Sequence, residues 1–182
     1  MLKEDYKKKI KELQKGEYIP LSGDLQFKYI FGTNENIKYT TDLLELMLKK
    51  EKDSLKGLKI ESEVKLDKET VRSKSFELDI IVRLSNGNVI NLEMQRMLGR
   101  DAEIKNTLYV TKLFGSMVKR GEKYRNINKI IQIEIIEKNK RHKTKDKINY
   151  YHISNDKEPK DKILEEIFEI MTIDIEKEKE VS

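Results

Sequence analysis

The chain has 182 residues, a length typical of one domain, with 37% hydrophobic and 39% charged residues. It holds no cysteine, which excludes disulfides, thiolate-bound zinc and a cysteine nucleophile, and no apolar run is long enough to span a membrane. The net charge of +5 comes from 38 basic and 33 acidic residues and favours a polyanionic partner only weakly. We expect a soluble, cytoplasmic protein.

The N-terminal region predicts a helical extension ahead of a single main domain. Apolar residues recur at helical spacing between Leu2 and Gln14, among many lysines. We therefore expect residues 1–19 to form a helical extension and residues 20–182 to form one domain.

Two short helices are expected next, each with a polar residue at its start. Ser22 or Asp24 is placed to cap a first helix, which stops at Gly32. Thr40 or Thr41 is placed to cap a second helix, and lysines follow it where they favour a helix C-terminus.

From residue 58 onward the hydrophobic period changes from helical to strand-like. Residues 58–66 predict one strand with a wet face, and "FELDIIVRLSNGNVINLEMQ", Phe76–Gln95, predicts two strands joined by a turn. The even-numbered apolar residues of these two strands must share a face, so the numbers of paired residues must sum to an even value. A two-residue Asn86-Gly87 turn gives an odd sum and is excluded.

Two longer loops satisfy this rule. A three-residue loop, Ser85–Gly87, with its glycine in the left-handed conformation, brings Asp79 directly opposite Glu93. A loop of residues 86–88 instead pairs Asp79 with Gln95 and leaves Glu93 one position along on the same face. Both versions gather Asp79, Glu93 and Gln95 into one patch.

The rest of the chain predicts a buried helix, a strand covered on both faces and a less regular tail. The helix ends by Gly121, and its apolar stripe consists of Ile104, Leu108, Leu113, Phe114 and Met117. Residues 130–136 are nearly all isoleucine, which is typical of a strand buried on both faces. A basic loop, Lys138–Lys147, precedes a strand at 148–154, a helix within 159–170 and a closing strand at 171–177. The order of elements indicates a mixed α/β domain.

Asp79 and Glu93 stand where a buried strand normally carries apolar side chains. Two carboxylates about 5 Å apart repel by roughly 3 kcal/mol at an effective dielectric of about 20, so a shared proton, a basic side chain or a divalent cation must offset them. Mg²⁺ needs only one or two protein carboxylates, so Asp79, Glu93 and the main-chain carbonyl of Met94 fit a half-built site. Gln95 could orient a water molecule but is a poor proton acceptor. The competing interpretation is an exposed pair neutralised by nearby basic side chains.

The run Phe76–Gln95, preceded by "GDLQFKYIFG" and followed by "LYVTKLFGSMVKRGEKYRNINKIIQIEIIE", resembles the PD-(D/E)XK nuclease family transposases, also called recombination-promoting nucleases. The likeness extends from about residue 21 to residue 177. It implies a restriction-endonuclease-like αβββαβ core, with a mixed sheet flanked by helices. It also implies a DNA endonuclease that depends on Mg²⁺ or Mn²⁺ and promotes recombination in bacteria. Its partner would be DNA, we expect no association with a membrane, and the protein could form a homodimer.

The resemblance also implies roles for particular residues. Asp79 matches the motif's aspartate and Glu93 the acidic residue of the third strand, so these two would hold the metal together with Met94. Gln95 stands at the position that is lysine in the wider superfamily, which leaves the general base unassigned. Asp24, in the stretch D-x-x-F-K-x-x-F-G, is placed to complete the metal site, to cap its helix, or both.

The alternative is a catalytically inactive DNA-binding or regulatory protein that retains the nuclease fold. Gln95 at the lysine position favours this interpretation. So does the expectation that the C-terminal region is shortened, because members of the family commonly continue well beyond residue 182. The basic loop Lys138–Lys147 could contact the DNA backbone in either case.

Overall fold

The structure is a computed structural model that describes residues 22–66, 76–97, 99, 101–118, 121, 123, 126–138, 146–158 and 167–175. The predicted N-terminal extension, most of the basic loop and most of the helix predicted within 159–170 lie outside these residues. Within the described part of the chain, no helix has the length and apolar composition needed to cross a bilayer.

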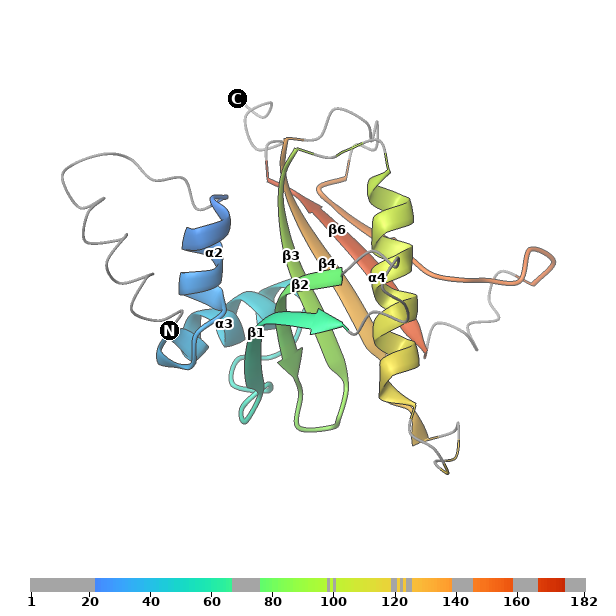
Figure 1. The fold of residues 1–182 in the computed structure, drawn as a ribbon, viewed down its shortest axis with the longest axis horizontal. Coiled ribbons are helices and arrows are strands. Elements are labelled where there is room, and N and C mark those ends of the chain that lie inside the picture. The colour runs from blue at the N-terminus through green and yellow to red at the C-terminus, as the bar shows by residue number, and fades with distance from the viewer. Residues whose placement is uncertain are drawn as a thin grey trace.

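A six-stranded mixed sheet forms the centre of the fold (Figure 1). Its spatial order is β1-β2-β3-β4-β6-β5. The strands are β1 (Lys59–Leu66), β2 (Phe76–Arg83), β3 (Val89–Met97), β4 (Ile130–Lys138), β5 (Ile148–Tyr151) and β6 (Phe168–Asp174). The β1-β2-β3 meander is antiparallel, β3, β4 and β6 run parallel to one another, and β5 pairs antiparallel with β6.

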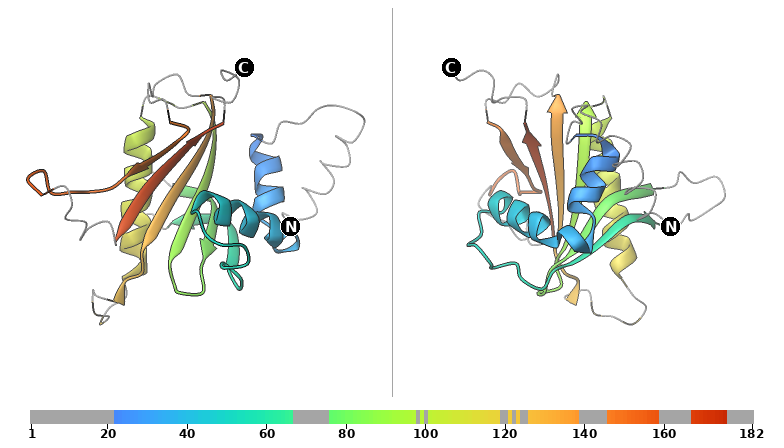
Figure 2. Two further views of the ribbon diagram at one scale, coloured as in Figure 1. Left: turned by 180° about the vertical axis from the view of Figure 1, so that it is seen from behind. Right: turned by 90° about the vertical axis from the view of Figure 1, so that its left-hand side faces the viewer.

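Helices cover both faces of this sheet (Figure 2). The first face is covered by α2 (Asp24–Phe31) and α3 (Ile37–Met47), which are separated by a 3₁₀ turn at Asn34–Asn36. The opposite face is covered by α4 (Ala102–Met117), which connects β3 to the parallel strand β4. A parallel pair needs such a crossover, because a tight turn cannot join strands that run in the same direction. The mixed sheet with flanking helices confirms the predicted restriction-endonuclease-like α/β fold.

The sheet divides the apolar core into two main clusters. On the side of α2 and α3, Phe27 and Leu44 pack against β1, β2, β3, β4 and β6. On the side of α4, Val110 and Leu113 pack against β2, β3 and β4. The isoleucines of β4 contribute to both sides, so that strand is covered on both faces, as its isoleucine-rich sequence predicted.

The turn between β2 and β3 is the three-residue loop Ser85–Gly87. The Leu84 N–H donates to the Asn88 carbonyl at 2.9 Å, and Gly87 has a φ of 88°. A Cβ at Gly87 would also come within 2.7 Å of the Asn128 side chain, so the position excludes side chains by conformation and by space.

This turn selects the first of the two predicted registers. Ile80 pairs with Leu92, so Asp79 and Glu93 stand one residue beyond the last pair, on opposite strands. The alternative pairing of Asp79 with Gln95 is wrong. The parity of the apolar residues excluded the two-residue turn correctly, and the left-handed glycine decided between the two loops that remained.

The capping predictions for the first two helices were wrong. Gly23 is the N-cap of α2 without a side-chain hydrogen bond, and Asp24 is already the first helical residue. The helix α3 begins at Ile37, so Thr40 and Thr41 lie inside it and donate their hydroxyls to main-chain carbonyls. A threonine inside a helix can satisfy its hydroxyl in this way, so threonine alone is an ambiguous start signal.

The apolar stripe predicted for α4 is also wrong in its first half. Ile104 and Leu108 are 62% and 47% exposed, whereas Asn106 is buried; Leu113 is buried as predicted. The helix is rotated so that Asn106 faces Glu134 on β4, with which it forms a hydrogen bond. The helix also ends before its predicted stop.

The C-terminal prediction is confirmed for the two strands, and most of the range given for the helix between them lies outside the described residues. β5 lies within the strand predicted at 148–154, and β6 overlaps the strand predicted at 171–177. β6 begins at Phe168, so a helix within 159–170 ends before that residue, and the closing strand begins three residues earlier than predicted. A short apolar run fits both periods, and pairing with β4 decides in favour of the strand here.

Candidate active site

The candidate site lies where β2 separates from β3. β2 stays paired with β1 along its whole length, but its pairing with β3 ends at Ile80 and Leu92. At this opening the Asp79 N–H donates to Oε1 of Glu93 at 3.1 Å, and the Met94 N–H donates to Oδ2 of Asp79 at 3.4 Å. Each carboxylate is therefore held by the main chain of the opposite strand, and the two converge.

The same separation explains one packing difference. Leu78 was predicted to share a face with Ile80, but it packs in the cluster beneath α4. Ile80 packs on the side of α2 and α3. Beyond Ile80 the strand β2 follows β1 rather than β3, so its faces no longer match those of β3.

Lys28 brings positive charge to Asp79 from α2. Its Nζ lies 3.1 Å from Oδ1 of Asp79 and 2.8 Å from Oδ1 of Asp24, although Lys28 is only 6% exposed. Burial lowers the pKa of Lys28, but the hydrogen bond with Asp24 and the charge of Asp79 outweigh burial and raise it. Lys28 therefore remains charged and joins Asp24, whose side chain is 70% exposed, to Asp79.

Glu93 lies deeper and is 2% exposed. Burial and then the charge of Asp79 raise its pKa from 4.5 to about 7, while Lys105 opposes the shift. The Nζ of Lys105, from α4, lies 3.5 Å from Oε2 of Glu93, and the Asn91 side-chain amide donates to Oε1 at 3.3 Å. The pair of carboxylates thus has less positive charge around it than two ionised groups need.

Polar side chains continue from Glu93 across the side of the sheet beneath α4. Parallel pairing places Asn91 beside Gln132 and Glu93 beside Glu134. The Asn91 side-chain amide donates to Oε1 of Gln132 at 2.7 Å, and the Asn106 amide donates to Oε2 of Glu134 at 2.6 Å. Burial raises the pKa of Glu134, against the hydrogen bond from Asn106. A buried polar layer thus extends from the candidate site to α4.

The structure brings together three of the residues selected from the sequence, namely Asp79, Glu93 and the main chain of Met94. Gln95 follows Glu93 by two residues on β3, is partly buried and pairs with Ile136 of β4. Asp24 reaches Asp79 only through the ammonium of Lys28. Most of the basic loop lies outside the described residues.

Sequence reasoning missed the two lysines. Lys28 stands four residues after Asp24, the spacing of an ion pair on one helix face, so that signal was present in the sequence. Lys105 carried no such signal, because its contact with Glu93 depends on how α4 lies over the sheet. Lys105 also lies over the ring of Tyr109, 4.9 Å from its centre, and burial raises the pKa of that phenol.

The donor set fits a hard divalent cation. Asp79 and Glu93 offer oxygen ligands on neighbouring strands, and Mg²⁺ commonly takes only one or two carboxylates from protein, with water and phosphate oxygens as its other ligands. Among the residues that the structure describes, no group of three or more histidines and carboxylates could enclose a metal ion. The raised pKa of Glu93 is consistent with a site that lacks one positive charge.

The fold and the site together define an α/β nuclease-like protein, in which a hairpin presents two carboxylates beside a crossover helix. A family model described as PD-(D/E)XK nuclease family transposase matches residues 21–182, and the chain belongs to this family. Membership indicates a nuclease with a transposition-related function, and PD-(D/E)XK nucleases generally depend on a divalent metal. Neither the curated proteins nor the solved structures gave a match.

Proposed function

We propose that the protein is a metal-dependent DNA endonuclease that hydrolyses phosphodiester bonds at Asp79 and Glu93. The observation that supports this proposal best is the convergence of two carboxylates, each fixed by the main chain of the opposite strand. Mg²⁺ or Mn²⁺, held by Asp79, Glu93 and the carbonyl of Met94, would neutralise the phosphate and favour attack by water. We infer that cleavage serves DNA recombination in the bacterial cytoplasm.

The local charges support a site for a cation and a phosphate together. Three carboxylates, those of Asp24, Asp79 and Glu93, face the ammonium groups of Lys28 and Lys105. The remaining negative charge favours a divalent cation, whose excess charge would in turn favour the phosphate. Lys28 holds the carboxylate of Asp79 in place through its contact at 3.1 Å, and Lys105 opposes the rise in the pKa of Glu93.

The remaining polar groups have smaller proposed roles. Gln95 would orient the attacking water, but an amide is too weak a base to take its proton. Asp24 would act through Lys28, which it holds at 2.8 Å, rather than as a ligand of the metal. The attacking water would then give its proton to a phosphate oxygen of the DNA rather than to a protein side chain.

A DNA-binding protein that has lost cleavage is the second candidate. The observation that favours it is Gln95, which stands where the wider superfamily has a lysine. This candidate predicts DNA affinity that falls with salt and that survives the loss of either carboxylate. The nuclease proposal predicts cleavage that needs both carboxylates and a divalent cation.

Plasmid nicking distinguishes the two. The wild type would be compared with Asp79→Ala and Glu93→Ala in Mg²⁺, in Mn²⁺ and in EDTA, with Asp42→Asn, an exposed position on α3, as the matched control. The nuclease predicts metal-dependent nicking in the wild type and the control only. Equal turnover by Asp79→Ala would contradict the site, and DNA binding without nicking in any metal would favour the second candidate.

A further inference from the structure

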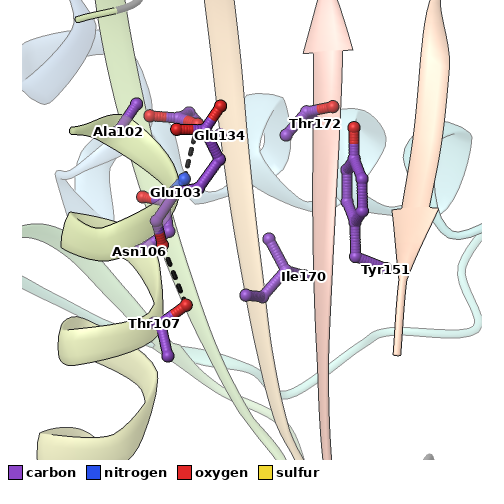
Figure 3. A pocket seen from close by; sticks show the side chains of 8 residues that line it. All are labelled: Ala102, Glu103, Asn106, Thr107, Glu134, Tyr151, Ile170 and Thr172. Atoms are coloured by element: carbon purple, nitrogen blue, oxygen red, sulfur yellow. Dashed lines mark hydrogen bonds between the residues drawn. The ribbon is translucent and has the colours of Figure 1, made fainter. Parts of the chain in front are cut away.

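A cavity lies between α4 and the strands β4, β6 and β5 (Figure 3). Its volume is about 160 Å³. In Figure 3, Asn106 and Thr107 come from α4 on one side of it, and Tyr151 of β5 stands on the other. Its walls include Ala102, Asn106, Glu134, Tyr151, Ile170 and Thr172.

Strand pairing places this cavity next to the candidate active site. Glu93 on β3 pairs with Glu134 on β4, and Glu134 pairs with Thr172 on β6. Adjacent strands lie about 4.8 Å apart, so the cavity wall is only one to two strand spacings from the catalytic carboxylates. Glu93 and Glu134 are the middle residues of the nine-residue strands β3 and β4, and Thr172 lies in the second half of β6.

Two residues of the cavity wall each have a buried side-chain oxygen without a hydrogen-bond donor among the described residues, namely Oε1 of Glu134 and Oδ1 of Asn106. The two side chains are joined by a single bond, from the Asn106 amide to Oε2 of Glu134. Both residues are at least nine-tenths buried. A buried acceptor without a donor is costly, so an N–H group that reached either oxygen through a small side-chain movement would be bound favourably.

The walls of the cavity suit a flat ring. Ala102 and Ile170 provide apolar surface, and Tyr151 provides an aromatic side chain at the outer edge. A cavity of about 150 Å³ with apolar walls is known to hold one benzene molecule, so the present volume accommodates one six-membered aromatic ring. The ligand is therefore expected to be a small aromatic ring that carries N–H donors.

We propose that this cavity binds a single unstacked nucleobase with an exocyclic amino group, of which cytosine is the smallest, from the DNA strand whose phosphate lies at Asp79 and Glu93. The inference rests on the proposed nuclease function. Carboxylates accept hydrogen bonds from the amino group of cytosine, which assigns that contact to Glu134. Tyr151 supplies the ring on which the base stacks.

This site would determine which DNA is bound best. Removing a base from a duplex costs a few kcal/mol, and the cost is smallest where the base is already unpaired. DNA with an unpaired cytosine near the cut should therefore bind more tightly than fully paired DNA. Thymine, which lacks the amino group, should bind less tightly than cytosine at the same position.

The test measures binding without cleavage. Fluorescence anisotropy would compare four labelled duplexes, which are fully paired or carry one bulged cytosine, thymine or abasic site, with Ca²⁺ in place of Mg²⁺ and a gel to verify intact DNA. Tyr151→Ala removes the stacking ring. Its matched control is Tyr150→Ala, because the ring centre of this neighbouring tyrosine lies 5.8 Å from the ammonium of Lys49 and the residue lines a different pocket, beside Leu48.

We expect the wild type and Tyr150→Ala to bind the cytosine bulge about fivefold or more tighter than the abasic bulge, and Tyr151→Ala to lose this preference. Glu134→Gln, which keeps an acceptor for Asn106, should reduce the preference for cytosine over thymine. DNA bound equally in all four forms by the wild type would overturn the base site and leave the nuclease proposal standing. No affinity for any DNA would overturn both.

Discussion

Glu93 and Glu134 occupy matching places on neighbouring strands, yet their surroundings differ. They are paired residues of the parallel strands β3 and β4, and both are almost fully buried beneath α4. Consecutive residues of α4 reach them, because Lys105 approaches Glu93 at 3.5 Å and Asn106 donates to Glu134 at 2.6 Å. One carboxylate has a counter-charge, whereas the other has a neutral amide.

The difference shows that burial alone does not prepare a carboxylate for metal chemistry. Burial raises the pKa of both glutamates. The carboxylate of Glu93 converges with that of Asp79, and this pair offers the negative charge that favours a divalent cation. Glu134, held by Asn106, is suited to accepting a hydrogen bond.

The largest expected effect is a difference in DNA-nicking rate between variants of the two glutamates. Glu93→Gln should lower the nicking rate at least about a hundredfold, because it removes a proposed ligand of the metal. Glu134→Gln should lower the rate by less than about tenfold, because it alters a proposed contact with a base and still accepts the hydrogen bond from Asn106. Initial rates of plasmid nicking in Mg²⁺ measure both. Comparable losses in the two variants would make the two carboxylates part of one site.

The pH dependence of stability should show the same contrast. The pKa of Glu93 is raised from 4.5 to about 7, so the folded state holds this proton more tightly than the unfolded state. Stability from this group is therefore fully present below about pH 4.5 and is lost as the pH rises to about 7, by up to roughly 3 kcal/mol. Urea unfolding of the metal-free protein from pH 4.5 to 8 measures the loss.

Glu93→Gln isolates this contribution, because glutamine does not titrate. As the pH rises, the free energy of unfolding of the variant should increase relative to that of the wild type. Addition of Mg²⁺ should narrow this difference by stabilising the ionised Glu93 of the wild type. The contribution of Glu134 has the same sign, since burial raises its pKa too, but Mg²⁺ should not change it. Parallel pH curves for the wild type and Glu93→Gln would contradict the raised pKa.

A smaller effect is expected from the amide that holds Glu134. Asn106→Ala removes the donor to a buried carboxylate, which should lower the free energy of unfolding by about 1–3 kcal/mol. Thr111→Ala, an exposed position on the same helix, is the matched control and should stay within about 0.5 kcal/mol of the wild type. Urea unfolding at neutral pH measures both. Equal values would mean that the Asn106 bond adds no stability.

The smallest effect is expected at Asp24. Its carboxylate is largely exposed and contacts Lys28, so Asp24→Asn should reduce nicking by less than about tenfold while Asp79→Ala abolishes it. The same plasmid assay, run at several Mg²⁺ concentrations, provides the comparison. A loss as large as that of Asp79→Ala, relieved by more Mg²⁺, would place Asp24 among the ligands of the metal.

The hairpin between β2 and β3 could be predicted largely from local sequence. Strand side chains alternate strictly, so the parity of the apolar residues is sufficient to exclude the Asn86-Gly87 two-residue turn. The left-handed Gly87 then follows from the three-residue loop. Because turn and alternation are both local, the patch that contains Asp79 and Glu93 could be predicted from the sequence.

The helix α4 shows where that reasoning ends. Its sequence suggested that Ile104 and Leu108 face the core, but the structure exposes them and buries Asn106. The hydrogen bond between Asn106 and Glu134 joins residues 28 positions apart, so no local period reveals it. A helix rotates to satisfy buried polar partners as well as apolar ones.

The sequence by itself determined the β2–β3 hairpin, the strand β4 that is covered on both faces, and the two carboxylates on one patch. These features could be predicted because strand periodicity and turn geometry act over a few residues. Only the tertiary structure decided that Lys28 and Lys105 flank those carboxylates and that Glu134 faces a cavity. These contacts depend on how α2 and α4 lie on the sheet, which the summed packing of distant residues decides.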